Sequence, residues 1–187
     1  MNVSLEQELV QHCAATLLGV KAGSLVSVSN RENPGLNGQL SCYNVQLRSC
    51  GLVFVPLCQC KTRTLVFVCR PEDLSRRLDE PEARAILEQA GYPLGRGVGA
   101  LVAHLRRRLM EQHGFPHEIG LFLDYPTEDV VGFLRDGGAG SKFCGYWKVY
   151  GDVDAAKARF ASFDACRDCL IRQLQAGKTI STLLNAA

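Results

Sequence analysis

The sequence predicts a single-domain α+β protein, with a mixed or antiparallel sheet of about five strands and helices packed on it. The chain has 187 residues, of which 47% are hydrophobic, which is enough for one domain with its own core. Segments with a helical apolar period and short β-rich runs both occur. A hairpin followed by helices of uneven length does not suit a regular parallel βαβ series. We therefore treat residues 1–187 as one domain.

The chain is expected to begin with a helix and a strand. Apolar side chains recur at three- and four-residue spacing over residues 4–19, which predicts a helix with Ser4 as its cap. Residues 24–29 alternate apolar and polar side chains, the period of a strand. Residues 30–39 are rich in asparagine and glycine and predict a loop.

A β-hairpin and two short helices should follow. Two β-rich runs, 50–58 and 63–70, are joined by a short polar link, which is the pattern of a hairpin. Pro56 indicates that the first strand lies at a sheet edge or carries a bulge, because proline has no N–H to donate to a neighbouring strand. Helices are predicted from Pro71 onward and over residues 80–90.

The second half of the chain is expected to alternate helices and strands. Periodicity predicts helices over residues 97–112, 126–134 and 152–175. Strands are predicted at residues 117–123 and 143–150, and the second of these is rich in aromatic side chains.

Charge and composition narrow the classes of function. The formal net charge of +2 is too small to indicate binding to nucleic acid or to an acidic membrane surface. No apolar run approaches the roughly 20 residues of a membrane-spanning helix. The first residues lack the basic start of a secretory signal, and nine cysteines are an odd number, so we expect a cytoplasmic protein with reduced thiols. The oligomeric state stays open, and the partner could be a small molecule or a protein.

The first candidate site is His12-Cys13. A cysteine becomes a nucleophile when its pKa falls, commonly beside a histidine. On a helix His12 points about 100° away from Cys13, so the base would have to come from elsewhere, and His117 is the natural candidate. The alternative interpretation is that Cys13 only packs on the buried face of its helix.

The second candidate site is the segment Phe115-Pro116-His117-Glu118. A histidine that follows a proline at the start of a strand is well placed to act as a base or a ligand. Glu118, Asp124 or Asp129 would orient its imidazole, and Asp124 and Tyr125 are candidate substrate-binding residues. The alternative interpretation is a histidine that hydrogen-bonds a neighbouring loop.

The third candidate site is the aromatic segment that starts at Cys144. Alternation along one strand would place one set of side chains on a single face, as the wall of a substrate pocket. That set is Cys144, Tyr146, Lys148 and Tyr150, and His12 completes the candidate substrate-binding residues. Trp147 would lie in the core, and Gly145 would leave space for another group. The alternative interpretation is a set of ordinary core aromatics.

Cysteine spacing gives weaker signals for a metal site. Cys58-x-Cys60 and Cys166-x-x-Cys169 have the spacing of metal ligands, but the second pair falls inside a predicted helix with no matching pair. We therefore assign no metal ligand, and the cofactor is unknown.

Three motifs resemble a known family. HCAATLLGVK at 12–21, FPHEIGLFLDYPTEDVVGF at 115–133 and CGYWKVYG at 144–151 resemble a bacterial family of unknown function, the one numbered 3793, found largely in anaerobes. That family usually has glycine where this chain has Asp124, and proline where it has Ala15. The resemblance implies an intracellular bacterial protein and implies no reaction.

Three classes of function stay open. The first is a thiol-dependent hydrolase or transferase with Cys13 as nucleophile and His117 as base. The second is a protein that binds a metal, haem or another redox cofactor. The third is a regulatory or interaction module without catalysis.

Overall fold

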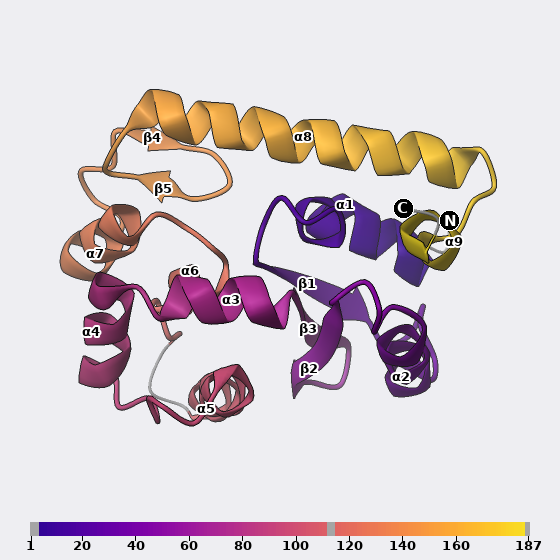
Figure 1. Ribbon diagram of the computed structural model, residues 1–187, viewed down its shortest axis with the longest axis horizontal. Helices are drawn as coiled ribbons and strands as arrows, with labels where there is room; N and C mark the ends of the chain where they lie inside the picture. Colours follow the sequence, from indigo (N-terminus) through magenta and orange to yellow (C-terminus); the bar gives the residue numbers. More distant parts are fainter. Residues whose placement is uncertain (1–3, 112–114, 186–187) are drawn as a thin grey trace.

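The computed structural model describes residues 4–111 and 115–185, which contain helices and two small antiparallel sheets (Figure 1). The helices are α1 (Leu5–Leu17), α2 (Leu36–Gln46), α3 (Pro71–Leu78), α4 (Pro81–Gln89), α5 (Val98–Met110), α6 (Ile119–Phe122), α7 (Thr127–Asp136), α8 (Val153–Gln175) and α9 (Ile180–Asn185). The strands are β1 (Gly23–Ser29), β2 (Val53–Gln59), β3 (Arg63–Cys69), β4 (Phe143–Cys144) and β5 (Lys148–Val149). The α+β class is confirmed. Within the described residues, no helix is both long and apolar enough to cross a membrane.

The larger sheet has the strand order β1-β3-β2 and is antiparallel throughout. Pro56 lies on the edge strand β2, and the register of β2 against β3 shifts between Pro56 and Cys58. Both expected consequences of this proline are therefore confirmed. The prediction of about five strands in one sheet is wrong, because β4 and β5 pair only with each other in a separate sheet.

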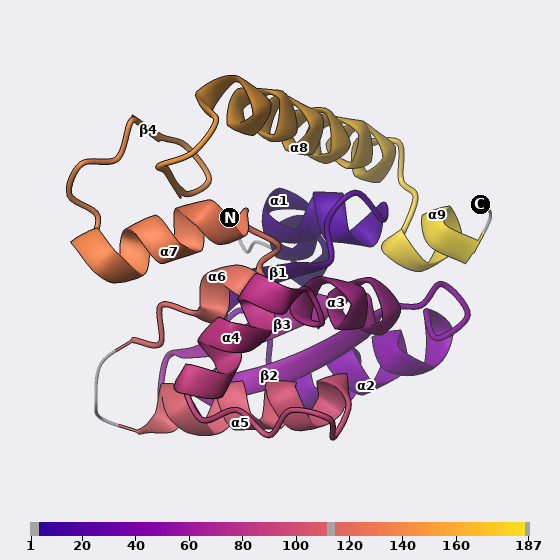
Figure 2. The same cartoon turned by 60° about the vertical axis from the view of Figure 1, so that its left-hand side comes forward.

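Apolar clusters cover both faces of the larger sheet. Helices α1 and α2 pack on one face, where Leu9, Leu40 and Phe54 share a core. Helices α3 to α6 pack on the other face, around Phe67 and Phe122. Figure 1 and Figure 2 show α8 lying across α1, with the β4–β5 hairpin between α8 and α7. A third cluster joins this hairpin to α8.

Capping side chains explain where helices α1 and α8 begin. Ser4 accepts a hydrogen bond from the N–H of Gln7, whose side chain accepts one from the N–H of Ser4, so α1 begins with a capping box. Asp152 accepts hydrogen bonds from the N–H groups of Asp154 and Ala155 at the start of α8. The predicted helix over residues 152–175 is confirmed.

Two predicted strands are wrong. Residues 117–118 form a turn and residues 119–122 form α6, and the N–H groups of Ile119, Gly120 and Leu121 donate to carbonyls three residues earlier. All four residues of α6 are buried, so apolar spacing could not distinguish a helix from a strand. Residues 143–150 fold back as the β4–β5 hairpin, and the N–H of Gly145 donates to the carbonyl of Trp147 across its turn.

Helix α2 has no counterpart among the predicted elements, and neither has α9. The predicted loop 30–39 is wrong beyond residue 35, where α2 begins. Glycine and asparagine are poor helix formers, and α2 contains both. Tertiary contacts compensate: Leu40 is buried, and the amide of Asn44 donates to the carbonyl of Phe54 at 2.9 Å and accepts from its N–H at 2.7 Å.

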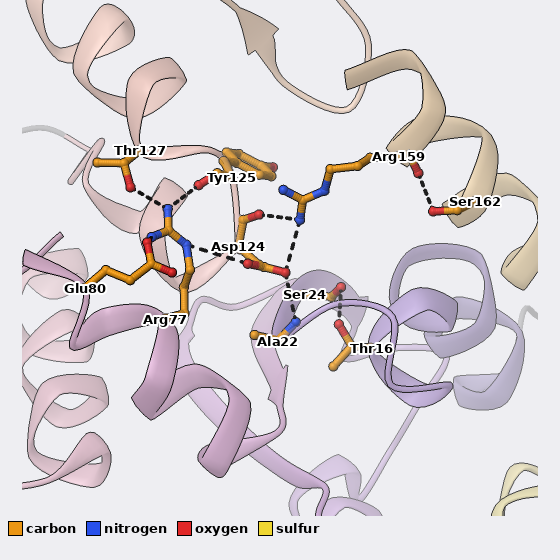
Figure 3. Close-up of polar contacts among 10 residues, drawn as sticks. All are labelled: Thr16, Ala22, Ser24, Arg77, Glu80, Asp124, Tyr125, Thr127, Arg159 and Ser162. Carbon is orange, nitrogen blue, oxygen red and sulfur yellow. Dashed lines mark hydrogen bonds and ion pairs between the residues drawn. The ribbon is translucent and has the colours of Figure 1, made fainter. Parts of the chain in front are cut away.

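A polar network around Asp124 joins segments that are far apart in the sequence (Figure 3). Asp124 has a left-handed backbone, with φ of 57°, and its carboxylate accepts a hydrogen bond from the N–H of Ala22 at 3.3 Å. Arg159 of α8 donates to its carbonyl at 2.8 Å and to its carboxylate at 3.1 Å. Arg77 of α3 lies 3.6 Å from the other carboxylate oxygen and donates to the carbonyl of Tyr125 at 2.7 Å. The network therefore ties α3 and α8 to the turn between α1 and β1.

Replacing Asp124 by alanine should lower the free energy of unfolding by about 2 kcal/mol, because two half-buried guanidinium groups lose their shared carboxylate. Asp124→Asn keeps an acceptor for the N–H of Ala22 and should cost less. Urea unfolding followed by circular dichroism measures both changes. Glu88→Ala, which removes an exposed carboxylate on α4, is the control. If Asp124→Ala unfolds at the same urea concentration as this control, the network does not hold the helices together.

Candidate functional site

A pocket of about 340 Å³ lies between the segment before α6, helix α7 and the β4–β5 hairpin. Six of the candidate residues line it: His117, Tyr125, Asp129, Cys144, Tyr146 and Lys148. Phe115, Phe133 and Trp147 supply further walls. We call this cavity the aromatic pocket.

The rings around the pocket are held by packing against one another. Tyr125 stacks on Trp147 with centroids 4.8 Å apart and planes at 27°. Trp147 meets the ring of Phe160 edge to face at 4.4 Å. On the other side, the ring of His117 lies 4.8 Å from that of Phe133. Such contacts fix the ring positions before any ligand arrives.

Asp129 anchors the hairpin that forms one wall. It is 3% exposed, and its carboxylate accepts a hydrogen bond from Trp147 Nε1 at 2.6 Å. It also accepts from the backbone N–H groups of Tyr150 and Gly151, at 2.7 and 2.8 Å. Asp129 therefore positions Trp147, and its oxygens serve the hairpin rather than the imidazole of His117.

Gly145 allows the hairpin to approach α8. A Cβ atom at this position would lie 2.3 Å from the ring of Phe160, well inside van der Waals contact. The expectation that Gly145 leaves space for another group is therefore confirmed, and that group is an aromatic ring of α8.

Three reactive or charged groups face the aromatic walls. The thiol of Cys144 and the ring of His117 belong to exposed residues, and Lys148 is half-buried. Cys144 and Lys148 are direct partners across the hairpin, so they share one face although the single strand predicted for them is wrong. The ammonium group of Lys148 donates to the carbonyl of Gly138 at 3.2 Å.

The structure does not bring Cys13 to this pocket. Cys13 is fully buried in the core between α1 and the sheet, whereas His117 is exposed. Burial raises the pKa of the Cys13 thiol to about 12, and the nearby Lys21 opposes this only in part. The thiol thus lacks the exposure and the acidity that a nucleophile requires, and its environment is that of a core residue.

Glu118 and Tyr150 also lie outside the pocket lining. Glu118 is 4% exposed, and its carboxylate accepts a hydrogen bond from the hydroxyl of Tyr92 at 3.0 Å and pairs with Arg108 at 3.1 Å. Its role is therefore to join α5 to the segment before α6. The ring of Tyr150 packs against Gly132 of α7, and its buried hydroxyl has no hydrogen-bond partner among the described residues.

His12 and Asp124 occupy two further places. His12 is exposed on α1, where partial burial and the charge of Arg63 lower the pKa of its imidazole. Asp124 belongs to the network with Arg77 and Arg159. Neither side chain lines the aromatic pocket.

Sequence reasoning missed Phe133 as a pocket wall, and it missed Lys21. Lys21 is 8% exposed, and burial lowers the pKa of its ammonium group to about 8. The available signal was a lysine between the apolar residues Val20 and Ala22, at a helix-to-strand turn. A charged residue in such a setting is rarely buried without a partner.

Within residues 4–111 and 115–185, no three histidine, cysteine, aspartate or glutamate side chains gather as a group that could hold a metal ion. A metal held by protein side chains therefore has no support from the geometry of this part of the chain.

Comparison with known proteins identifies a family. The family described as Protein of unknown function (DUF3793) matches residues 9–184, nearly the whole chain, and confirms the resemblance of the motifs. No curated protein and no solved structure matches the chain.

Alkylation should separate the exposed thiols from the buried ones. At pH 8, a pKa of about 12 leaves about one Cys13 or Cys69 thiol in ten thousand ionised. Cys60 is exposed, and a hydrogen bond with Thr62 lowers the pKa of its thiol. Iodoacetamide followed by peptide mass spectrometry should label Cys60 first, and Cys13 and Cys69 only after unfolding. Labelling of Cys13 in the folded protein at the rate of Cys60 would contradict its burial.

Proposed function

The chain belongs to the DUF3793 family, and we propose that it binds a small, flat, largely apolar ligand with an anionic substituent in the aromatic pocket. The observation that carries this proposal is the convergence of six candidate residues and several fixed rings on one cavity. Residues 115–133 and 144–148 supply these side chains, although they are separate in the sequence.

The dimensions of the pocket indicate a ligand of modest size. Its volume of about 340 Å³ lies at the lower end of the roughly 300–1,000 Å³ usual for small-molecule sites. Rings that are already fixed by their neighbours lose little freedom when a flat ligand stacks on them. A flat redox-active ring system fits this description better than a metal ion held by side chains.

The polar groups favour a negative substituent on the ligand. Lys148 brings a positive charge to the lining, and His117 adds a ring nitrogen that can donate a hydrogen bond. The carboxylate in the lining, that of Asp129, already accepts three hydrogen bonds from the hairpin. An anionic group on the ligand would therefore meet donors without strong repulsion.

We also propose in which organisms and compartment the protein occurs. A bacterial, cytoplasmic protein of an anaerobe fits the family motifs, and all nine cysteines are free. We propose no nucleic-acid partner, because the net charge of +2 is small.

Trp147 is the single tryptophan, so its indole N–H gives one assignable signal in a ¹H–¹⁵N spectrum. Titration with 2-naphthoate should move this signal saturably, and the neutral 2-naphthylmethanol should bind more weakly. Phe133→Ala should weaken binding about tenfold, because a stacking ring is lost. Leu134→Ala, which alters an exposed residue of the same helix, should have no effect.

Lys148→Met should remove the preference for 2-naphthoate over the alcohol, and Lys61→Met, at the exposed β2–β3 turn, should retain it. If neither compound shifts the indole signal saturably in the folded protein, the proposed ligand class is wrong.

A second candidate function is thiol chemistry at the same pocket. Cys144 and His117 both line it and both are exposed, as a thiol nucleophile and its base must be. His117 would accept the thiol proton, and the thiolate would attack the carbonyl carbon of an ester or thioester in the bound ligand. The bond from that carbon to the alcohol or thiol leaving group would break as His117 returns the proton to it, and water or an acceptor would then release the acyl group from Cys144. This retains the hydrolase or transferase hypothesis with Cys144 in place of Cys13.

The second candidate predicts that Cys144 reacts with iodoacetamide faster than Cys42, an exposed cysteine on α2 that serves as the reference thiol. His117→Ala should slow the alkylation of Cys144 by about tenfold and leave that of Cys42 unchanged, because only Cys144 would lose its base. Timed peptide mass spectrometry measures both rates. Equal rates for the two thiols in the unmodified chain would exclude an activated Cys144.

A further inference from the structure

Lys21 has a largely buried side chain whose ammonium group the aromatic pocket does not use. Its side chain follows α1 and is 8% exposed. The ammonium nitrogen lies 5.3 Å from the centroid of the Tyr125 ring and 5.4 Å from that of Phe163. Among the described residues, no carboxylate lies within ion-pair distance of it and no acceptor takes its hydrogen bonds. A cation that is largely, though not completely, removed from water is stabilised by a further group that accepts its hydrogen bonds.

The charges around Lys21 leave an excess of positive charge. Asp124 favours its charged form, but the same carboxylate is shared by Arg77 and Arg159 (Figure 3). Glu80 pairs with Arg77 and is itself half exposed. Arg159 opposes the charge of Lys21, and the neighbouring Cys13 thiol stays neutral because burial raises its pKa to about 12. Lys21 therefore has no counter-ion of its own.

The Lys21 side chain lines a cavity of about 20 Å³ between α1, β1 and α8. This is room for a single water-sized group. His12, Tyr146 and Arg167 line this cavity and also a wider groove of about 580 Å³ outside it. The cavity therefore adjoins that groove.

The walls of the groove are more basic than acidic. Lys157 and Arg167 of α8 line it, together with one carboxylate, that of Asp164. Asp164 pairs with Arg167 at 2.7 Å and accepts a hydrogen bond from the hydroxyl of Tyr146 at 2.8 Å. Lys157 makes no ion pair among the described residues and lies over the ring of Phe143.

We propose that this groove is a binding site for an oxyanion, beside the aromatic pocket, with which it shares Gly145 and Tyr146 as wall residues. One oxygen atom of a carboxylate or phosphate group enters the small cavity and accepts a hydrogen bond from the Lys21 ammonium group. The rest of the ligand lies in the groove beside Arg167 and Lys157. Such a ligand supplies the counter-ion that the buried lysine lacks.

The test is an NMR titration of the full chain labelled with ¹³C-lysine, following the Cε signal of Lys21. Inorganic phosphate and acetate are added separately, with sodium chloride keeping the ionic strength constant. We expect the Cε signal of Lys21 to shift saturably with at least one of them. The bound anion should also raise the pKa of Lys21 by about one unit, which means that the anion binds the charged amine about tenfold more tightly than the neutral amine. A response to phosphate alone indicates a phosphoryl group, and a response to acetate alone indicates a carboxylate.

If neither anion shifts the Lys21 signal saturably, the proposal is overturned and the cavity holds only water. Lys21→Met assigns the signal and should abolish the binding of the anion, whereas Lys61→Met should leave the titration of Lys21 unchanged. The titration of the unmodified chain stands even if Lys21→Met fails to fold. Lys21→Met should still bind 2-naphthoate saturably, because Lys21 does not line the aromatic pocket and contacts it only through the ring of Tyr125.

Discussion

The carboxylate of Asp124 joins α3 and α8 to the α1–β1 turn, parts of the chain that are far apart in the sequence. It receives the N–H of Ala22 from the α1–β1 turn and the guanidinium groups of Arg77 and Arg159 from α3 and α8. Its left-handed backbone suits glycine, and aspartate is one of the few other residues that tolerate it. Because two guanidinium groups share one carboxylate, the neighbouring Lys21 lacks a counter-ion. The contacts of Asp124 thus join α3 and α8 to the α1–β1 turn, and they leave an excess of positive charge at Lys21, beside the groove.

A second carboxylate, that of Asp129, builds the aromatic pocket. Its three hydrogen bonds hold the hairpin against α7 and fix the indole of Trp147. Tyr125 lies between the aromatic pocket and the groove, because its ring stacks on Trp147 and the ammonium group of Lys21 lies over the same ring. The aromatic pocket and the groove are therefore neighbours that differ in chemistry: one offers flat apolar walls, and the other offers a buried cation.

Residue type alone was a poor guide to chemical role. Cys13 and Glu118 are reactive residue types, yet one is sealed in the core and the other is engaged with Tyr92 and Arg108. Cys144 and Lys148 were placed on one face by strand alternation, and they do share a face, but as partners across a hairpin. Sequence reasoning therefore found six of the fourteen residues that line the pocket, and it could not tell which side chains were already occupied by partners.

The sequence by itself determined the elements whose signals are local: the capped helices α1 and α8, the β2–β3 hairpin, and the edge position of Pro56. Apolar period, capping and turn chemistry act over a few residues, so they can be read without the fold. Only the tertiary structure decided that α2 and α6 are helices and that β4 and β5 form a hairpin. It also decided which carboxylates are paired and which thiols are buried. These depend on contacts such as that between Ala22 and Asp124, 102 residues apart, whose partners no local pattern identifies.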